Sequence, residues 1–238
     1  TDPAATLPEA RVGAQATLLV DESVLITGGR PSETGTPANA ASIFFPGQSQ
    51  TTEGNVAVSA PLPAARSDHS ATGLLDGRGL VAGGGGAAGT AIGSLEIFEP
   101  VARTFTDLSP VALATPRSHH IAVRLRSGGV LFAGGVDANG NLLSSAEIFD
   151  HESETVLSGF SMTGPRTDAR AVLLPDGRVL IAGGRDAGGA GVFALRLCGF
   201  FGRRLLRRRF LRHTFGLLFF FLVRSRFLFG FGRGLARG

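Results

Sequence analysis

The chain has 238 residues and contains no tryptophan, no tyrosine and one cysteine, Cys198, which excludes an intramolecular disulfide. Its charge is unevenly divided: residues 1–191 hold all 19 acidic residues and 12 arginines, a net charge of −7, whereas residues 192–238 hold 11 arginines and no acidic residue. The overall net charge of +4 is therefore an average over two unlike segments and does not by itself indicate a nucleic-acid-binding protein.

The first segment repeats an arginine that stands 17 residues before a Gly-Gly pair. The four sets are Arg11 with Gly28 and Gly29, Arg66 with Gly83 and Gly84, Arg117 with Gly134 and Gly135, and Arg166 with Gly183 and Gly184. A fixed spacing that returns every 49 to 55 residues is typical of a repeat protein. It predicts repeat units at 11–65, 66–116 and 117–165, a partial unit at 166–191, and hence a repeat array over residues 1–191.

Each unit opens with two predicted strands that form a hairpin. The first apolar run lies at 16–20, 71–75, 121–125 and 171–174, and the second at 23–27, 80–82, 130–133 and 179–182. Between them stands Asp21, Asp76, Ser127 or Asp176, followed in the last three units by Gly77, Gly128 and Gly177. Because glycine accepts a positive φ, these residues predict a tight hairpin turn of the primed type. The second run ends at the Gly-Gly pair, where the absence of side chains allows close backbone approach.

The second half of each unit predicts two more strands. A third run lies at 42–44, 96–98 and 147–149, and a weaker fourth run lies at 103–106 and 155–157. Four short antiparallel strands in about 50 residues correspond to one blade of a β-propeller.

This unit resembles the Kelch repeat, in the form common in bacterial extracellular proteins. The resemblance rests on Arg117-Ser118-His119-His120, on the run from Leu174 to Gly184 and on the run from Ser145 to Asp150, and it covers about residues 11–189. Kelch repeats usually carry a tryptophan in the fourth strand and a tyrosine in the third. Here Phe105 and Val156 lie in the region of the former, and Phe44, Phe98 and Phe149 in that of the latter, which keeps the apolar packing. The resemblance implies an all-β Kelch-like propeller outside the cell or at its surface.

The number of units predicts an incomplete ring. Propellers close with about 4 to 8 blades, whereas this chain supplies about three and a half four-stranded blades. We therefore expect exposed strand edges at both ends of the array and self-association through them.

The tail at 192–238 is built almost entirely from arginine, phenylalanine, leucine and glycine. The change falls in the middle of the fourth unit, near Arg196, where a third strand is expected but the Glu-Ile-Phe signal is missing. A shift of reading frame is our leading hypothesis for this change. A segment that lies on a membrane surface and a nucleic-acid contact are the alternatives, and 11 arginines predict non-specific adhesion to anionic membranes or nucleic acid in every case.

The repeat also singles out polar residues: Arg66, His69, Arg117, His119, His120 and Arg166. Because they recur with the repeat, we interpret them first as structural groups that bond to acidic or carbonyl groups between blades. The alternative is that they line one mouth of the propeller and contact a ligand.

Other motifs in the chain favour turns over sites. Gly84, Gly86 and Gly89 match G-x-G-x-x-G, but a strand instead of a helix is predicted to follow, and a Walker loop is excluded because the chain has no lysine. Asp137, Asn139 and Asn141 imitate the opening of a calcium loop, but Leu142 occupies its glycine position. The sequence therefore predicts no metal, no cofactor and no catalytic residue.

The resulting functional hypothesis is a binding module that recognises a protein or a carbohydrate and is not an enzyme. A copper radical oxidase needs tyrosines that this chain lacks. Two alternatives remain: a fragment of a propeller enzyme that acts on sugars, similar to an epimerase, and a frameshifted product without a selected function.

Overall fold

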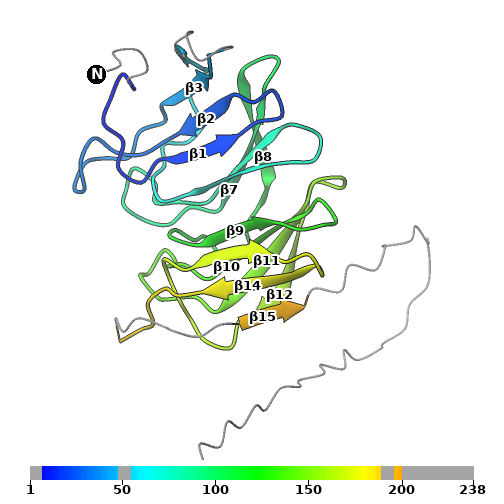
Figure 1. Cartoon of the computed structure of the whole chain (residues 1–238). Coiled ribbons are helices and arrows are strands. Elements are labelled where there is room, and N and C mark those ends of the chain that lie inside the picture. Colours follow the sequence, from blue (N-terminus) through cyan, green and yellow to red (C-terminus); the bar gives the residue numbers. More distant parts are fainter. Residues whose placement is uncertain (1–6, 48–54, 189–195, 200–238) are drawn as a thin grey trace, which may run out of the picture. The chain divides into compact units, whose positions relative to one another are not determined.

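The computed structural model describes residues 7–47, 55–188 and 196–199. The regular structure of these residues consists of strands in four antiparallel sheets (Figure 1). In the part of the chain that is described, no helix has the length and apolar character needed to cross a membrane. The part of the chain that the structure describes is all-β, as predicted.

Each sheet is a meander in which strands adjacent in sequence are adjacent in space. Sheet 1 consists of β1 (Gln15–Leu18), β2 (Val24–Thr27), β3 (Ala41–Phe45) and β4 (Asn55–Val58), and sheet 2 of β5 (Ser70–Gly73), β6 (Gly79–Ala82), β7 (Ser94–Glu99) and β8 (Thr104–Ala112). Sheet 3 consists of β9 (Ile121–Arg124), β10 (Val130–Ala133), β11 (Ser145–Asp150) and β12 (Thr155–Ser161), and sheet 4 of β13 (Arg170–Leu173), β14 (Arg178–Ala182) and β15 (Arg196–Gly199). This is the strand order of propeller blades.

The hairpin turn differs from the predicted primed type. In sheet 2 the Gly77 N–H donates to the Leu74 carbonyl at 3.3 Å, and the Leu74 N–H donates to the Arg78 carbonyl at 2.8 Å. Only Gly77 in this loop has a positive φ, +91°. The loop therefore has three residues with glycine last, a geometry that adds a bulge after an ordinary turn, and the prediction of a primed turn was wrong.

The fourth sheet contains a third strand although the Glu-Ile-Phe signal is missing there. β15 pairs with β14 so that Arg196 lies opposite Ile181, which is the register of Glu96 opposite Val81 in sheet 2. The strand begins beyond residue 191, where we expected the repeat array to end. The other expectations for the tail concern residues 200–238 and lie outside the described residues.

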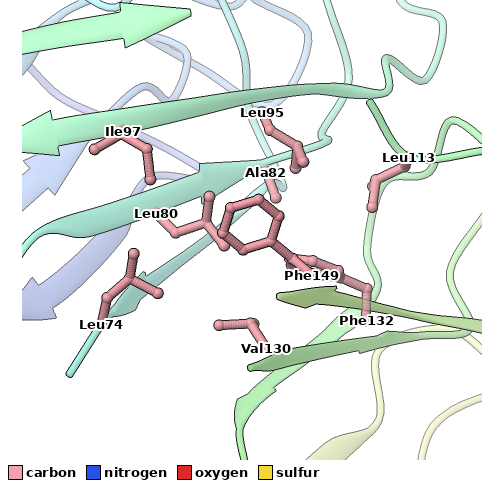
Figure 2. Packing of buried hydrophobic residues seen from close by; sticks show 9 residues of the cluster. All are labelled: Leu74, Leu80, Ala82, Leu95, Ile97, Leu113, Val130, Phe132 and Phe149. Atoms are coloured by element: carbon pink, nitrogen blue, oxygen red, sulfur yellow. The ribbon is translucent and has the colours of Figure 1, made fainter. Parts of the chain in front are cut away.

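Successive sheets pack in chain order. The first strands contact one another in the sequence β1, β5, β9, β13. Between sheets 2 and 3, the cluster in Figure 2 brings Leu80 and Ala82 of β6 against Val130 and Phe132 of β10. All residues of β6 and of β10 are buried, because each strand has a neighbouring sheet on both faces. Their uninterrupted apolar runs follow from this two-sided burial.

Phenylalanines occupy central positions in these interfaces. Phe98 and Phe149, in the third strands of sheets 2 and 3, are fully buried. The ring of Phe98 lies 4.9 Å from that of Phe105 in β8, with the two planes tilted by 50°. Burial of one such side chain contributes roughly 1.5–3 kcal/mol, so these residues retain the packing role expected of larger aromatics.

Candidate functional site

Two arginines of the repeat are fully buried in ion pairs. Arg66 and Arg117 have no exposed surface. The guanidinium of Arg117 donates to Glu147 Oε1 at 2.6 Å, to the Gly134 carbonyl at 3.0 Å and to the Ser145 hydroxyl at 3.0 Å. Arg66 makes the matching bonds to Glu96, Gly83 and Ser94. The recurring offset of 17 residues is thus the distance along the chain from an arginine to the glycine carbonyl that accepts a hydrogen bond from its guanidinium.

The backbone of each arginine bonds to the preceding sheet, while its side chain bonds to its own sheet. The Arg117 N–H donates to the Ile92 carbonyl at 3.2 Å, and the Arg117 carbonyl accepts from the Gly84 N–H at 2.8 Å. Gly84 and Ile92 belong to the β6–β7 connection of sheet 2, whereas Gly134 and Glu147 belong to sheet 3. The arginine therefore ties two sheets together.

Burial acts on both members of the ion pair in sheet 2. It lowers the pKa of Arg66, against the attraction of Glu96, and it raises the pKa of Glu96, against the attraction of Arg66. Burial likewise lowers the pKa of Arg117, opposed by Glu147. Removing charges from water is costly, so each buried arginine is tolerated only while its glutamate partner is present.

The Gly-Gly pairs allow the approach between sheets. All eight glycines have a positive φ: Gly28, Gly29, Gly83, Gly84, Gly134, Gly135, Gly183 and Gly184. A Cβ on Gly83 would lie 2.6 Å from the Arg117 carbonyl oxygen, closer than any side chain tolerates. Glycine at this position is therefore required both by the backbone conformation and by the neighbouring sheet.

The first and last arginines have incomplete versions of this network. Arg11 donates to the Ala40 carbonyl at 3.4 Å and to the Ser42 hydroxyl at 3.1 Å, so a serine replaces the glutamate. Arg166 donates to the Gly183 carbonyl at 3.3 Å, and its Nε has no hydrogen-bond partner among the described residues. By register, Arg196 occupies the position of the missing glutamate in sheet 4.

The two repeated histidines bond across sheet boundaries. His69 Nε2 lies 2.8 Å from the Thr27 hydroxyl of sheet 1, and His120 Nε2 lies 2.9 Å from the Ser70 hydroxyl of sheet 2. Burial lowers the pKa of His120 to about 3 and holds that of His69 well below its ordinary value. Both imidazoles are therefore neutral at physiological pH, which suits a packing role.

A row of four residues lies two positions after each repeat arginine: Gly13, Asp68, His119 and Asp168. The Asp68 N–H donates to the Gly13 carbonyl at 2.8 Å, the His119 N–H to the Asp68 carbonyl at 2.9 Å, and the Asp168 N–H to the His119 carbonyl at 3.2 Å. The φ angles of the last three residues are +53°, +51° and +54°. Residues other than glycine rarely adopt this backbone conformation, and those that do cluster at functional sites.

Short polar contacts join the side chains of this row to one another and to Arg30. His119 Nδ1 lies 3.2 Å from Asp168 Oδ1, and His119 Nε2 lies 3.7 Å from Asp68 Oδ2. Arg30 Nη2 lies 3.0 Å from the same oxygen of Asp68. We call Arg30, Asp68, His119 and Asp168 the mouth row. Their side chains are 25%, 14%, 39% and 50% exposed, so a ligand can reach them.

An open groove of about 390 Å³ runs beside the mouth row. Four segments form its walls: residues 30–37 of sheet 1, residues 85–89 of sheet 2, the segment that precedes β5 and the segment that precedes β9. Arg30, Asp68 and His119 of the mouth row line it, with Glu33 and Ser118. All these segments lie at the end of the sheets where second strands finish and third strands begin.

The structure divides the residues singled out in the sequence into two groups. His119 lies in the groove, whereas Arg66, Arg117, Arg166 and His69 are buried between sheets and His120 is half-buried there. The repeat pattern did not single out Arg30, Asp68, Asp168 or the two glutamate partners. A usable signal was present, because Glu96 and Glu147 both lie 30 residues after their arginines.

The glycine-rich motif and the motif that imitates a calcium loop both form turns. In the G-x-G-x-x-G segment, the Gly86 N–H donates to the Thr90 carbonyl at 2.9 Å and the chain continues into β7. The Asp137 carboxylate accepts from the Asn141 side-chain amide at 3.1 Å and from the backbone N–H groups of Asn139 and Asn141, both at 2.8 Å, and these bonds lower its pKa. Within the described residues, no group of three or more histidine, cysteine or acidic side chains could hold a metal ion.

Comparisons with known proteins agree with the architecture. No family model matches the sequence, and no curated protein matches it. The structure is similar to the solved structure of YjhT, with a TM-score of 0.61 and 16% sequence identity over 78% of this chain and 61% of that one. At this identity the similarity concerns the fold alone, and the chain spans about three fifths of the length of YjhT. The four antiparallel sheets and this similarity make the chain an incomplete β-propeller.

Proposed function

We propose that this protein is part of a Kelch-type β-propeller that binds a carbohydrate or protein ligand in the groove beside the mouth row. The Kelch assignment is supported by the recurring arginine, Gly-Gly and Glu-Ile-Phe signals, which the structure explains as one connected network in sheets 2 and 3. Secretion or display at the cell surface is part of this proposal and rests on the resemblance to extracellular Kelch proteins.

The observation that carries the proposal is that three polar side chains of the mouth row, those of Arg30, Asp68 and His119, line one groove. A volume of about 390 Å³ lies within the range of small-molecule sites. The groove offers directional donors and acceptors: the guanidinium of Arg30, the carboxylates of Glu33 and Asp68, the imidazole of His119 and the hydroxyl of Ser118. Such a lining suits a ligand rich in hydroxyl groups, and we therefore favour a carbohydrate over an apolar peptide.

The test is binding of the full chain to an array of printed glycans, compared with His119→Ala and His151→Ala variants. His151 lies in the β11–β12 turn, at the opposite end of sheet 3, and serves as the matched control. Loss of one hydrogen bond to a charged group costs about 1.5–3 kcal/mol, so we expect His119→Ala to weaken binding roughly ten-fold or more. No bound glycan, or equal binding by both variants, would contradict carbohydrate recognition in the groove.

A sugar-processing enzyme is the second candidate, because His119 lies between two carboxylates at 3.2 and 3.7 Å. This grouping could move a proton to or from a substrate. The two candidates are separated by nuclear magnetic resonance of free sugars incubated with the protein. Binding without interconversion supports the proposed module, whereas interconversion that His119→Ala abolishes would establish the enzyme.

A further inference from the structure

Every contact between successive sheets uses the same backbone bond. The second glycine of each Gly-Gly pair donates its N–H to the carbonyl of the next repeat arginine: Gly29 to Arg66 at 2.9 Å, Gly84 to Arg117 at 2.8 Å and Gly135 to Arg166 at 2.8 Å. The backbone bonds that connect Gly13, Asp68, His119 and Asp168 in turn add a second link at each contact. We call this arrangement the joint.

The leucine of the second strand recurs at every joint: Leu25 packs with Phe98, and Leu131 packs with Val179 and Ile181. Between sheets 2 and 3, Leu80 and Ala82 pack against Val130, Phe132 and Phe149 of the next sheet. These last three residues have no exposed surface. Each joint therefore has a leucine side and an opposite side, which we call the phenylalanine side after its residues in sheet 3, and a sheet in the middle of the array carries one on each face.

The two ends of the array each present one unmatched side. By register, Leu180 and Ala182 of sheet 4 correspond to Leu80 and Ala82, yet both are only half-buried, and Val172 on the same face is 52% exposed. In sheet 1, Val24, Ile26 and Phe44 correspond to the phenylalanine side and are half-buried, and Leu18 beside them is 67% exposed. None of these seven residues belongs to a core cluster of the described part of the chain.

Gly183 gives an independent indication that a joint partner fits on sheet 4. A Cβ on Gly83 or Gly134 would lie 2.6 or 2.5 Å from the carbonyl oxygen of the next arginine. A Cβ on Gly183 would meet nothing within 4 Å among the described residues. The space that an arginine carbonyl fills at the other joints is open here.

We propose that a second copy of this chain fills that space, with its sheet 1 docked on sheet 4 of the first copy. The Gly184 N–H would donate to the partner's Arg11 carbonyl, as Gly84 donates to Arg117. The leucine side and the phenylalanine side of a joint are both carried by this one chain, at opposite ends, so a second copy supplies the complementary surface. Such a head-to-tail contact closes into a ring or grows into a chain, and two copies bring eight sheets, the upper end of the usual range.

The test uses one charged substitution on each end face, Leu18→Asp and Val172→Asp. Both side chains are exposed, so the monomer keeps its core. In sedimentation velocity over a wide range of protein concentration, we expect the unmodified chain to associate and each variant alone to remain monomeric, with at least ten-fold weaker association. Val101→Asp, which removes a 92% exposed apolar side chain from the β7–β8 turn, is the matched control and should associate normally.

Mixing the two variants gives the sharper result. Each variant retains the end face that the other has lost, so an equal mixture should form one intact joint and stop at the dimer. Gly183→Ala, which adds only a methyl group at the joint, should also weaken association of an otherwise intact chain. A strictly monomeric unmodified chain, association that both charged variants leave unchanged, or failure of the mixture to pair would overturn the proposal.

Discussion

Buried arginines in this protein differ physically from its surface ion pairs. Arg117 and Glu147 have side chains that are 0% and 2% exposed, whereas Arg178 and Asp176 are 47% and 48% exposed. An exposed pair contributes little because water screens it. A buried pair is different, because loss of one member leaves the other charged and without water.

Replacement of Arg117 by alanine should therefore be severe. Arg117→Ala leaves the buried carboxylate of Glu147 without its counter-charge, and we expect the free energy of unfolding to fall by about 3–5 kcal/mol in urea denaturation. Arg166→Ala is the matched comparison, since Arg166 is also buried but donates to a carbonyl instead of a carboxylate among the described residues. It should cost about 1–2 kcal/mol. If both variants lost the same free energy of unfolding, the ion pair with Glu147 would contribute no more to stability than the burial of an arginine bonded to a carbonyl.

The neutral histidines predict a loss of stability in mild acid. In the unfolded chain His120 ionises near pH 6.5, whereas burial holds its folded pKa at about 3. Between these values the unfolded state binds the extra proton, so the free energy of unfolding falls as pH decreases below about 6.5. Each such histidine contributes a slope of about 1.4 kcal/mol per pH unit, and His69 acts in the same direction.

Urea denaturation from pH 7.5 to 4.5 measures this slope. His120→Gln keeps a polar side chain opposite Ser70 and cannot titrate, so its stability should depend on pH less steeply by about one proton. Carboxylates contribute equally to both proteins and cancel in the comparison. Identical slopes for the variant and the unmodified chain would show that His120 takes up its proton over the same pH range in the folded and the unfolded state.

At the scale of elements, the joint between sheets depends on the second strand ending in glycine. Gly83 and Gly183 hold equivalent positions with φ angles of +62° and +71°. An alanine at either position bears the same backbone strain, about 1 kcal/mol. Only at Gly83 does the new methyl group also meet the carbonyl of a neighbouring sheet.

Gly83→Ala should accordingly destabilise the chain more than Gly183→Ala does, by roughly 1–3 kcal/mol, the usual cost of overpacking. Urea denaturation at low protein concentration, where association does not contribute, gives the difference directly. If both variants lost the same stability, backbone strain would account for the glycines and the close approach of the sheets would not.

At the scale of the whole molecule, the four described sheets form an array in which each sheet packs against its neighbours in chain order. Core clusters join sheets 1 and 2, sheets 2 and 3, and sheets 3 and 4. In such arrays the end units have fewer contacts and lower stability. Sheet 4 fits this expectation, because its arginine lacks the glutamate and its second strand is only partly buried.

The basic tail predicts a second property of the whole chain. Residues 200–238 contain ten arginines and no acidic residue, so the full chain should bind vesicles of anionic phospholipid and release them as salt is raised. A chain ending at Gly199 should not bind, and vesicles of neutral lipid serve as the control for both proteins. Equal binding by the two chains would place the attraction outside the tail. Translation of the coding region for residues 180–238 in the other frames tests whether this tail is a frameshift.

The sequence by itself determined the sheets, their order and the incompleteness of the propeller, because strand patterns and the arginine-to-glycine spacing are local and recur within each unit. For the same reason it predicted that phenylalanines of the third strand serve in apolar packing. Only the tertiary structure decided which polar groups meet. Arg30, Asp68, His119 and Asp168 come from four different units, and no spacing within one unit brings them into a row. The tertiary structure also decided β15, since the edge of β14 accepts a strand through backbone bonds that do not depend on the missing Glu-Ile-Phe signal.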